Sequence, residues 1–280
     1  MAEALVLGGG GVAGIAWMTG LLAGLADAGQ DVTGADVIVG TSAGSTVGAQ
    51  LGGGLSLEEL YARQVEPELQ VAEITADVDM ERFVAEIGAA LRDAGTVAQM
   101  RRAVGRFALD AATVPEAERR AVIEARLPSH EWPARTLKIV AVDAESGEPR
   151  VFDDASGVGL VDAVAASCAV PGVWPPVTIG GRRYIDGGVR SGENADYAAG
   201  ASRVLVIAPL GGLELIPGDK PLDRAVEELR AAGAEVAVVV PDEASRAAMG
   251  ANPLDPATRR PAAEAGRAQG RNLKIAWTRT

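Results

Sequence analysis

The chain has 280 residues, of which 48% are hydrophobic and 23% are charged, so it can bury a full core in one large domain or two modest ones. It holds 35 glycines and 15 prolines, which together stay below the roughly 25–30% at which unstructured composition begins. The net charge of −12 argues against a nucleic-acid partner, because binding a polyanion requires a cationic face.

The N-terminus and the single cysteine bear on the compartment. The opening residues MAEALVLG lack the basic segment and the long apolar stretch of a signal peptide, and no apolar run approaches the ~20 residues of a membrane-spanning helix. We therefore expect a cytoplasmic protein. Cys168 lies in the apolar stretch AVAASCAVPG, so a disulfide framework is excluded and a small buried side chain is expected.

The first fifty residues alternate between strand and helix patterns. A buried strand is expected at Ala4–Leu7, a helix at Ile15–Gly29, a second strand at Asp36–Gly40 and a second helix at Ser45–Leu51. Such alternation is typical of a parallel sheet with helices on both faces.

The next segment, from Leu57 to Leu127, has no strand signal. SLEELYARQ, DMERFVAEIGAALRDAG and VPEAERRAVIEARL have the spacing of amphipathic helices, and Ser56 and Thr113–Pro115 are expected helix starts. The pattern predicts a helical insertion over about 55–130. Its sequence is compatible with a lid, a dimer surface or plain scaffold.

Strand patterns then return. TLKIVAVD (Thr136–Asp143) and ESGEPRVFD predict a strand, a turn and a returning strand, and a helix is expected at Val161–Ala169. Gly180–Gly181 turns one short strand into another that ends at Asp186. SRVLVIAPL and AEVAVVVPD predict two more buried parallel strands with a helix between them. No repeat or linker interrupts the chain, so residues 1–280 are expected to form a single domain.

The glycine loop LVLGGGGVAG raises two interpretations. Gly9, Gly11 and Gly14 satisfy G-x-G-x-x-G after a strand, which is the pattern of a dinucleotide-binding loop. That interpretation also requires an acidic residue about 20 residues further on, at the end of the second strand. The second strand runs into GTSAG instead, which disfavours a nucleotide-binding oxidoreductase.

GTSAG, from Gly40 to Gly44, lies between an expected strand and an expected helix. In that setting a strained turn presents the serine hydroxyl at the end of the strand, and the flanking glycines permit close backbone approach. The pattern predicts that Ser42 is a catalytic nucleophile.

A serine nucleophile needs a base. The one histidine, His130, lies in LPSHEWP, which is typical of an exposed connection, and the order Ser42, His130, Asp186 disagrees with that of α/β-hydrolases. Asp186 in YIDGGV is the better candidate, because a strand positions it and Gly187 and Gly188 leave room around it. An ordinary Asp-Gly-Gly turn is the alternative interpretation.

These blocks together resemble the patatin-like phospholipase family. The matching segments, in order, are GGGVAG at Gly9–Gly14, GTSAG at Gly40–Gly44 and DGG at Asp186–Gly188, and ASCAVPGVWPPV also resembles that family. The resemblance extends from the first strand to at least SRVLVIAPL. It implies a three-layer α/β/α sandwich with a mostly parallel central sheet. It also implies a Ser42–Asp186 dyad that hydrolyses acyl esters of lipids without a metal or an organic cofactor.

The glycine loop is then expected to hold an oxyanion. Backbone N–H groups at Gly9, Gly10 and Gly11 would face the developing charge, where each can contribute roughly 3–4 kcal/mol. The family often has Lys or Arg just before the last glycine of this loop, whereas this chain has Ala13. The nucleophile and base are unaffected, but a basic residue can have no role at that position.

One alternative keeps the fold without the reaction: a non-catalytic protein that binds lipids or acyl chains. The head group, the chain length, the choice between phospholipid, neutral lipid and thioester, peripheral membrane contact and the oligomeric state all stay open at this point.

Overall fold

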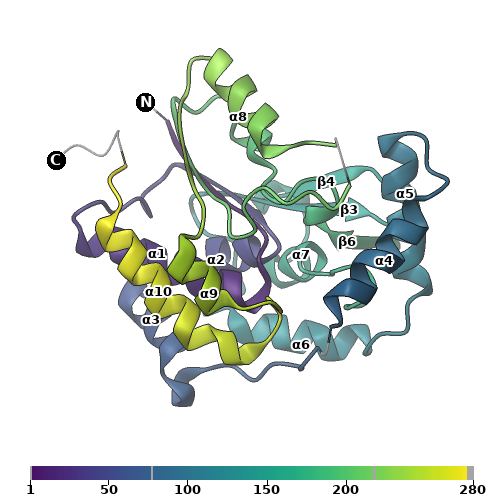
Figure 1. Cartoon of the computed structure of the whole chain (residues 1–280), viewed down its shortest axis with the longest axis horizontal. Coiled ribbons are helices and arrows are strands. Elements are labelled where there is room, and N and C mark those ends of the chain that lie inside the picture. Colours follow the sequence, from purple (N-terminus) through teal and green to yellow (C-terminus); the bar gives the residue numbers. More distant parts are fainter. Residues whose placement is uncertain (1, 77, 217–218, 276–280) are drawn as a thin grey trace.

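The protein, represented by a computed structural model, is described for residues 2–76, 78–216 and 219–275. A mixed sheet lies between layers of helices (Figure 1). The strands are β1 (Glu3–Leu7), β2 (Val37–Thr41), β3 (Thr136–Asp143), β4 (Pro149–Phe152), β5 (Val177–Ile179), β6 (Arg182–Asp186), β7 (Arg203–Ile207) and β8 (Glu235–Val239). The α-helices are α1 (Gly11–Asp27), α2 (Ala43–Leu51), α3 (Leu57–Val65), α4 (Met80–Leu91), α5 (Val97–Asp110), α6 (Glu116–Arg126), α7 (Leu160–Ser167), α8 (Leu222–Ala231), α9 (Glu243–Met249) and α10 (Arg259–Asn272).

The order of the strands brings the predicted motifs to one edge of the sheet. It is β5-β6-β3-β2-β1-β7-β8, with β4 paired to β3 outside this path. β1, β2, β3, β7 and β8 are parallel, whereas β4 and β6 run antiparallel to β3. Thr41 and Asp186 pair with Val140 and Ala141, which are neighbours on β3. Ser42 directly follows Thr41. It therefore lies at the same height along β3 as Asp186, on the opposite side of that strand.

Alternating side chains of the strands build two apolar cores, as the period of a strand requires. Leu5 and Leu7 of β1 belong to the core beneath α1, α2, α7 and α10. Ala4 and Val6 belong to the core beneath α8 on the opposite face. Figure 1 shows α8 on one side of the sheet and α1, α2, α9 and α10 on the other. This three-layer arrangement confirms the predicted fold class.

The helical insertion is present and contains α3, α4, α5 and α6. Ser56 is the N-cap of α3, where its hydroxyl accepts from the Glu59 N–H and the Glu59 carboxylate accepts from the Ser56 N–H. Such a capping box satisfies two of the backbone donors that a helix start leaves unpaired. Pro115 precedes α6, so both predicted helix starts are confirmed.

Two expectations are corrected by the structure, and two helices lie where no prediction was made. The first helix begins at Gly11 rather than Ile15, because the glycine loop leads directly into it. β8 is an edge strand and not a buried one, and Val238 on it is 39% exposed. No prediction was made for the chain after AEVAVVVPD, where α9 and α10 lie.

α10 packs along α1 through small residues. A Cβ on Gly20 or Gly24 of α1 would overlap the backbone of α10, and one on Gly266 or Gly270 would overlap the backbone of α1. The side chain of Gln269 accepts a hydrogen bond from the indole N–H of Trp17, at 3.1 Å. The last helix is thereby held against the helix that follows the glycine loop.

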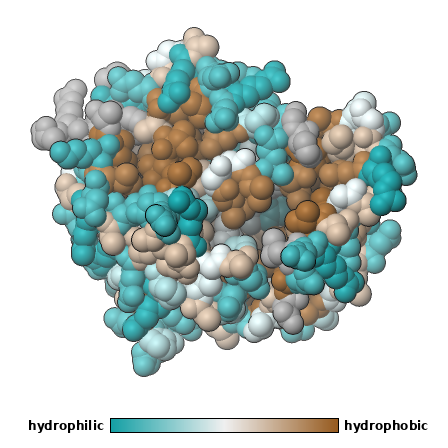
Figure 2. All heavy atoms as spheres, in the orientation of Figure 1, coloured by the Kyte–Doolittle hydropathy of each residue, from teal (hydrophilic) through white to brown (hydrophobic). Residues whose placement is uncertain are grey.

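Apolar side chains also reach the surface. Figure 2 shows hydrophobic residues gathered below α8 on the face that it draws. The exposed large apolar side chains include Leu210, Leu213, Val238 and Val240. Within the described part of the chain, no helix combines the length and the apolar character needed to cross a bilayer.

Candidate active site

The turn at Ser42 has a strained backbone. Ser42 joins β2 to α2 with φ at 52° and ψ at −117°, a conformation that residues other than glycine seldom adopt. Its side chain sits in a confined position, with the residue only 8% exposed. The strand, turn and helix predicted around Ser42 are all present.

The glycines on either side of this turn are required by packing. A Cβ on Gly40 would lie 2.6 Å from the Ser45 Cα, and one on Gly44 would overlap the carbonyl group of Leu7 on β1. Both approaches are closer than the contacts that real Cβ atoms make. The G-x-S-x-G spacing therefore lets α2 begin directly against the two central strands.

Residues at the end of α7 hold the turn in place. The Ser42 N–H donates to the Ser167 hydroxyl at 2.9 Å, and this hydroxyl donates to the Val140 carbonyl of β3 at 2.6 Å. The Cys168 thiol donates to the Ser42 carbonyl at 3.3 Å. Burial raises the pKa of the Cys168 thiol, which keeps it protonated as a donor. Cys168 is buried, as expected, but it also supports the turn, a role that its sequence context did not reveal.

Asp186 lies at the end of β6 with a buried carboxyl group. Its Oδ1 accepts from the Gly188 N–H at 2.7 Å, whereas its Oδ2 is buried without a hydrogen-bond partner among the described residues. Burial raises the pKa of Asp186 from 3.8 to about 7, against the opposing effects of the Gly188 N–H and the nearby Ser42 hydroxyl. Gly187 follows without a side chain because a Cβ there would overlap the Val140 carbonyl. The structure thus brings Ser42 and Asp186 together.

His130 lies elsewhere. Its side chain is 50% exposed, and its ring contacts Glu124 on α6, with Nε2 3.2 Å from the backbone carbonyl oxygen and Nδ1 3.8 Å from Oε1. The described contacts of His130 include neither Ser42 nor Asp186. LPSHEWP is a connection, as predicted, and it is exposed at His130 and Glu131, whereas Leu127 is buried.

The glycine loop adjoins Ser42. A Cβ on Gly9 would lie 3.6 Å from the Ser42 Cβ. The Gly9 N–H donates to the Gly192 carbonyl at 2.8 Å, so it is engaged within the protein. For Gly10 and Gly11, at the start of α1, no hydrogen bond of the N–H to another described residue is found. Ala13 occupies the position at which the family often has Lys or Arg. Its N–H donates to the Pro253 carbonyl at 3.0 Å.

Asn194 connects the two motifs and was not anticipated from the sequence. It is buried, with φ at 53°, and its Nδ2 lies 3.0 Å from Thr41 Oγ1 and 3.2 Å from the Gly187 carbonyl oxygen. Its Oδ1 accepts from Arg190 at 2.6 Å. One amide thereby links the residue before Ser42 to the residue after Asp186. No periodic pattern or motif marks this asparagine, because its role depends on contacts across 153 positions of the chain.

A cavity of about 20 Å³, room for a single water, opens onto Ser42. Four of its lining residues belong to the helical insertion: Glu73, Ile74, Arg119 and Arg126. Glu73 and Ile74 lie in the segment before α4, for which the sequence predicted no element. A wider cavity of about 380 Å³ shares Ile74 and Trp174 with it. The residues that line the smaller cavity are Gly11, Val12, Ile15, Ser42, Ala43, Glu73, Ile74, Arg119, Arg126, Cys168, Val170, Trp174 and Leu254.

Among the residues that the structure describes, no three His, Cys, Asp or Glu side chains gather as possible ligands of a metal ion.

Comparisons with known proteins address the whole chain. A search of curated proteins found no match. Among solved structures, VipD from Legionella pneumophila is 14% identical with a TM-score of 0.39, over 74% of this chain and 50% of VipD. The type III effector protein ExoU is 16% identical with a TM-score of 0.38, over 97% of this chain and 54% of ExoU. The chain spans about half the length of these two proteins.

The model of the patatin-like phospholipase family matches residues 5–199, more than half of the chain. This match contains the glycine loop, the turn at Ser42 and the end of β6 at Asp186, which are the three blocks that carry the resemblance in the sequence. The chain belongs to the patatin-like phospholipase family and is a relative of lipid acyl hydrolases.

Proposed function

We propose that this protein hydrolyses carboxylic ester bonds of lipids, with Ser42 as nucleophile and Asp186 as its base. The observation that carries the proposal is a buried Asp186 oxygen with no hydrogen-bond partner among the described residues, on a carboxyl group that lies beside a strained serine turn. A carboxylate held in this way can accept a proton from the Ser42 hydroxyl.

The reaction follows from that geometry. The Ser42 oxygen attacks the acyl carbonyl carbon while its proton passes to Asp186, and the carbonyl oxygen becomes an oxyanion. The N–H groups of Gly10 and Gly11 are the proposed donors to this oxyanion, at the positive end of the α1 dipole. The leaving alcohol takes the proton from Asp186. Water then attacks the acyl-enzyme with Asp186 again as base, which releases the fatty acid.

Gly9 has a different role in this proposal. Because its N–H donates to Gly192, Gly9 contributes close approach of the backbone to Ser42 and not a donor to the oxyanion. The wider cavity beyond Ile74 and Trp174 is the proposed space for the acyl chain, since apolar residues such as Val78 and Phe83 contribute to its lining.

The pH dependence of the reaction tests the base. Only the ionised carboxylate can accept the Ser42 proton, and burial raises the pKa of Asp186 to about 7. We therefore expect kcat/KM to be low at pH 5, to rise through an apparent pKa near 7 and to level off above pH ~8. Hydrolysis of a short p-nitrophenyl ester, followed by stopped assays across this range, measures it. A profile that stays flat down to pH 5 would contradict a buried Asp186 base.

Covalent labelling separates an enzyme from a non-catalytic acyl-binding protein on the same fold. We expect a serine-reactive fluorophosphonate to label Ser42, because the phosphonyl group forms the same tetrahedral centre at an activated oxygen. Mass spectrometry of the digested protein identifies the labelled peptide. A protein that binds fatty acid but carries no label at Ser42 would favour the binding function.

A further inference from the structure

Three arginines surround a single buried carboxylate near Ser42. Glu73 belongs to the segment between α3 and α4, and its side chain is 3% exposed. The guanidinium of Arg126 donates to both Glu73 oxygens, at 2.8 and 2.5 Å, and Arg259 also donates to one of them. Arg119 stands further off, with Nη1 3.6 Å from the Glu73 carboxylate, beyond hydrogen-bond geometry.

The charges in this cluster do not balance. The side chains of Arg119, Arg126 and Arg259 are 7–8% exposed, and Glu73 neutralises one of the three. Burial and the charge of Arg126 lower the pKa of Arg119 to about 10, so it stays charged at neutral pH. Uncompensated buried charges are costly, which is why they are normally paired.

Hydrogen-bond donors are also left over. Nε and Nη1 of Arg119 and the indole Nε1 of Trp174 are buried without an acceptor among the described residues. These groups are adjacent, because the Arg119 guanidinium lies 3.9 Å from the centre of the Trp174 ring. Spare donors together with excess positive charge are complementary to an anion that offers several acceptor oxygens.

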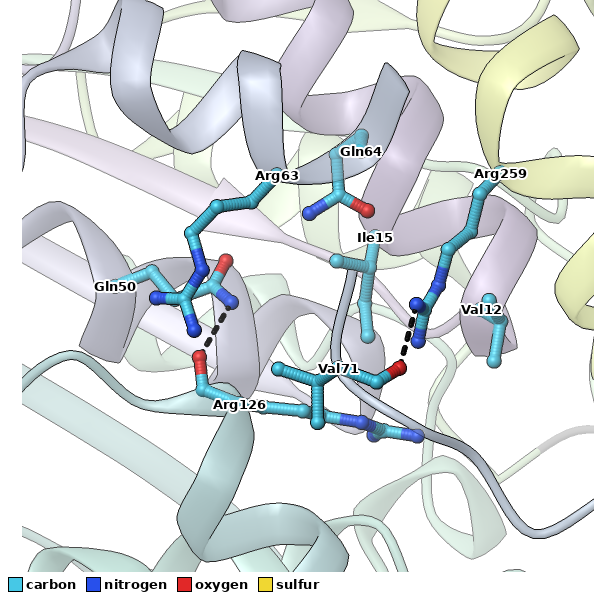
Figure 3. Close-up of a pocket in the computed structure, with 8 residues that line it drawn as sticks. All are labelled: Val12, Ile15, Gln50, Arg63, Gln64, Val71, Arg126 and Arg259. Atoms are coloured by element: carbon cyan, nitrogen blue, oxygen red, sulfur yellow. Dashed lines mark hydrogen bonds between the residues drawn. The ribbon is translucent and has the colours of Figure 1, made fainter. Parts of the chain in front are cut away.

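This donor cluster borders the proposed nucleophile. Arg119, Arg126 and Trp174 line the cavity that contains Ser42. An adjoining cavity of about 20 Å³ is lined by Arg126 and Arg259, and both cavities share Val12 and Ile15. In Figure 3 the side chains of Arg126 and Arg259 run to the same side of Val71, whereas Arg63 lies on the other side.

We propose that Arg119, Arg126 and Trp174, supported by Arg259, form a phosphate-binding subsite beside Ser42. The charge of the cluster favours phosphate over a simple carboxylate. The cluster has an excess of two positive charges, and a phosphate monoester carries about −1.5 to −2 at pH 7. The planar fork of an arginine pairs with the oxygens of either anion, so the excess charge is what distinguishes them.

The phosphate can be part of an acyl-ester substrate or a free anion. The substrate form rests on the proposed function, since it places the ester carbonyl next to Ser42. Because the cavity holds about one water, phosphate binding must displace part of its lining. Glu73 and Ile74 lie in residues 70–76, which follow η1 (Pro67–Leu69) and form neither helix nor strand. Glu73 already shows that these guanidinium groups can hold oxygens of an anion.

A substitution of Arg119 can distinguish phosphate binding from a purely structural role in holding Glu73. Arg126 and Arg259 make the hydrogen bonds to Glu73, so Arg119→Gln leaves that anchor in place. Arg120→Gln is the matched control, because Arg120 is the next residue on α6 and its side chain, 39% exposed, pairs with Asp162 and Glu124.

The first experiment compares monooctanoylglycerol with its phosphate monoester, which has the same acyl chain. We expect the wild-type protein to favour the phosphate ester through a lower KM, and Arg119→Gln to reduce that preference by ~10-fold or more, as for a lost hydrogen bond to a charged group. Arg120→Gln should keep the wild-type preference. A preference that Arg119→Gln leaves intact, or that both variants lose equally, would overturn the substrate form of the subsite.

The second experiment needs no catalysis. Inorganic phosphate should raise the melting temperature of the wild-type, Arg120→Gln and Ser42→Ala proteins and leave that of Arg119→Gln unchanged, since a ligand stabilises the state that binds it. This stabilisation without any preference between the esters would assign the subsite to free phosphate. Absence of both effects would overturn the subsite. If neither ester is hydrolysed, the proposed function fails, and phosphate stabilisation alone still decides the subsite.

Discussion

Ser42→Ala is expected to abolish hydrolysis of a short p-nitrophenyl ester, with a loss of at least ~10³-fold, while the protein stays folded. The reason is that the turn between β2 and α2 offers Ser42 as the nucleophile next to Asp186, and removal of a nucleophile leaves only binding and the oxyanion donors. Initial rates and circular dichroism spectra measure the two parts of the result. Activity within threefold of wild type would rule out Ser42 as the nucleophile.

Ser42→Gly is the matched variant, because it also lacks the hydroxyl but relieves the backbone. Glycine adopts positive φ at little cost, whereas alanine retains the strain at φ 52°. We expect both variants to be inactive and the glycine variant to be more stable than the alanine variant by ~1 kcal/mol or more. Equal melting temperatures would mean that the turn stores no strain.

Asp186→Asn is expected to lower kcat by ~10²-fold or more, in the range for removal of a general base. Asparagine keeps the shape and can still accept the hydrogen bond from the Gly188 N–H, but it cannot take the Ser42 proton as a carboxylate does. His130→Ala is the control and should change the rate little, since His130 is exposed and contacts Glu124. An inactive His130→Ala protein together with an active Asp186→Asn protein would reverse the assignment of the base.

The same Asp186→Asn variant has a signature in stability. The carboxyl pKa is about 7 in the folded protein and near 3.8 when unfolded, so the unfolded wild-type chain loses its proton first as pH rises. The folded wild-type protein is therefore destabilised progressively between pH ~4 and ~7, relative to a side chain that does not titrate. The stability advantage of Asp186→Asn should grow over this interval and stay constant above it. Denaturant unfolding at several pH values measures this difference.

Local chemistry explains which features the sequence predicted. β1, β2 and β3 are largely apolar runs that end at glycine-containing turns, and the short β6 lies between Gly181 and Gly187. Such signals need no knowledge of distant residues. The placement of Ser42 on a turn and of Asp186 at a strand end follows from the same signals. The order of the strands and their register then bring both residues together near the carboxyl ends of β2 and β3.

The features that escaped prediction depend on distant contacts. α10 has the sequence RRPAAEAGRAQGRN, whose glycines weaken a helix signal, and it is stabilised by close packing against α1. Glu73 is separated from Arg259 by 186 positions, and no spacing in the sequence announces that pair. The exposure of β8 likewise depends on its place at the edge, which its run of valines does not reveal.

The glycine loop is held by parts of the chain beyond the family match, which ends at residue 199. The Gly8 N–H donates to Ile207, Pro209 lies where a Gly10 side chain would be, and the Ala13 N–H donates to Pro253. The recognisable family segment is therefore shorter than the unit that shapes its own loop. A shortened version designed from the boundaries of the family segment would keep every motif residue and lose the neighbours that position them. Substitutions in the C-terminal part of the chain, outside the match, would therefore change the packing and hydrogen bonds of the loop without altering any motif residue.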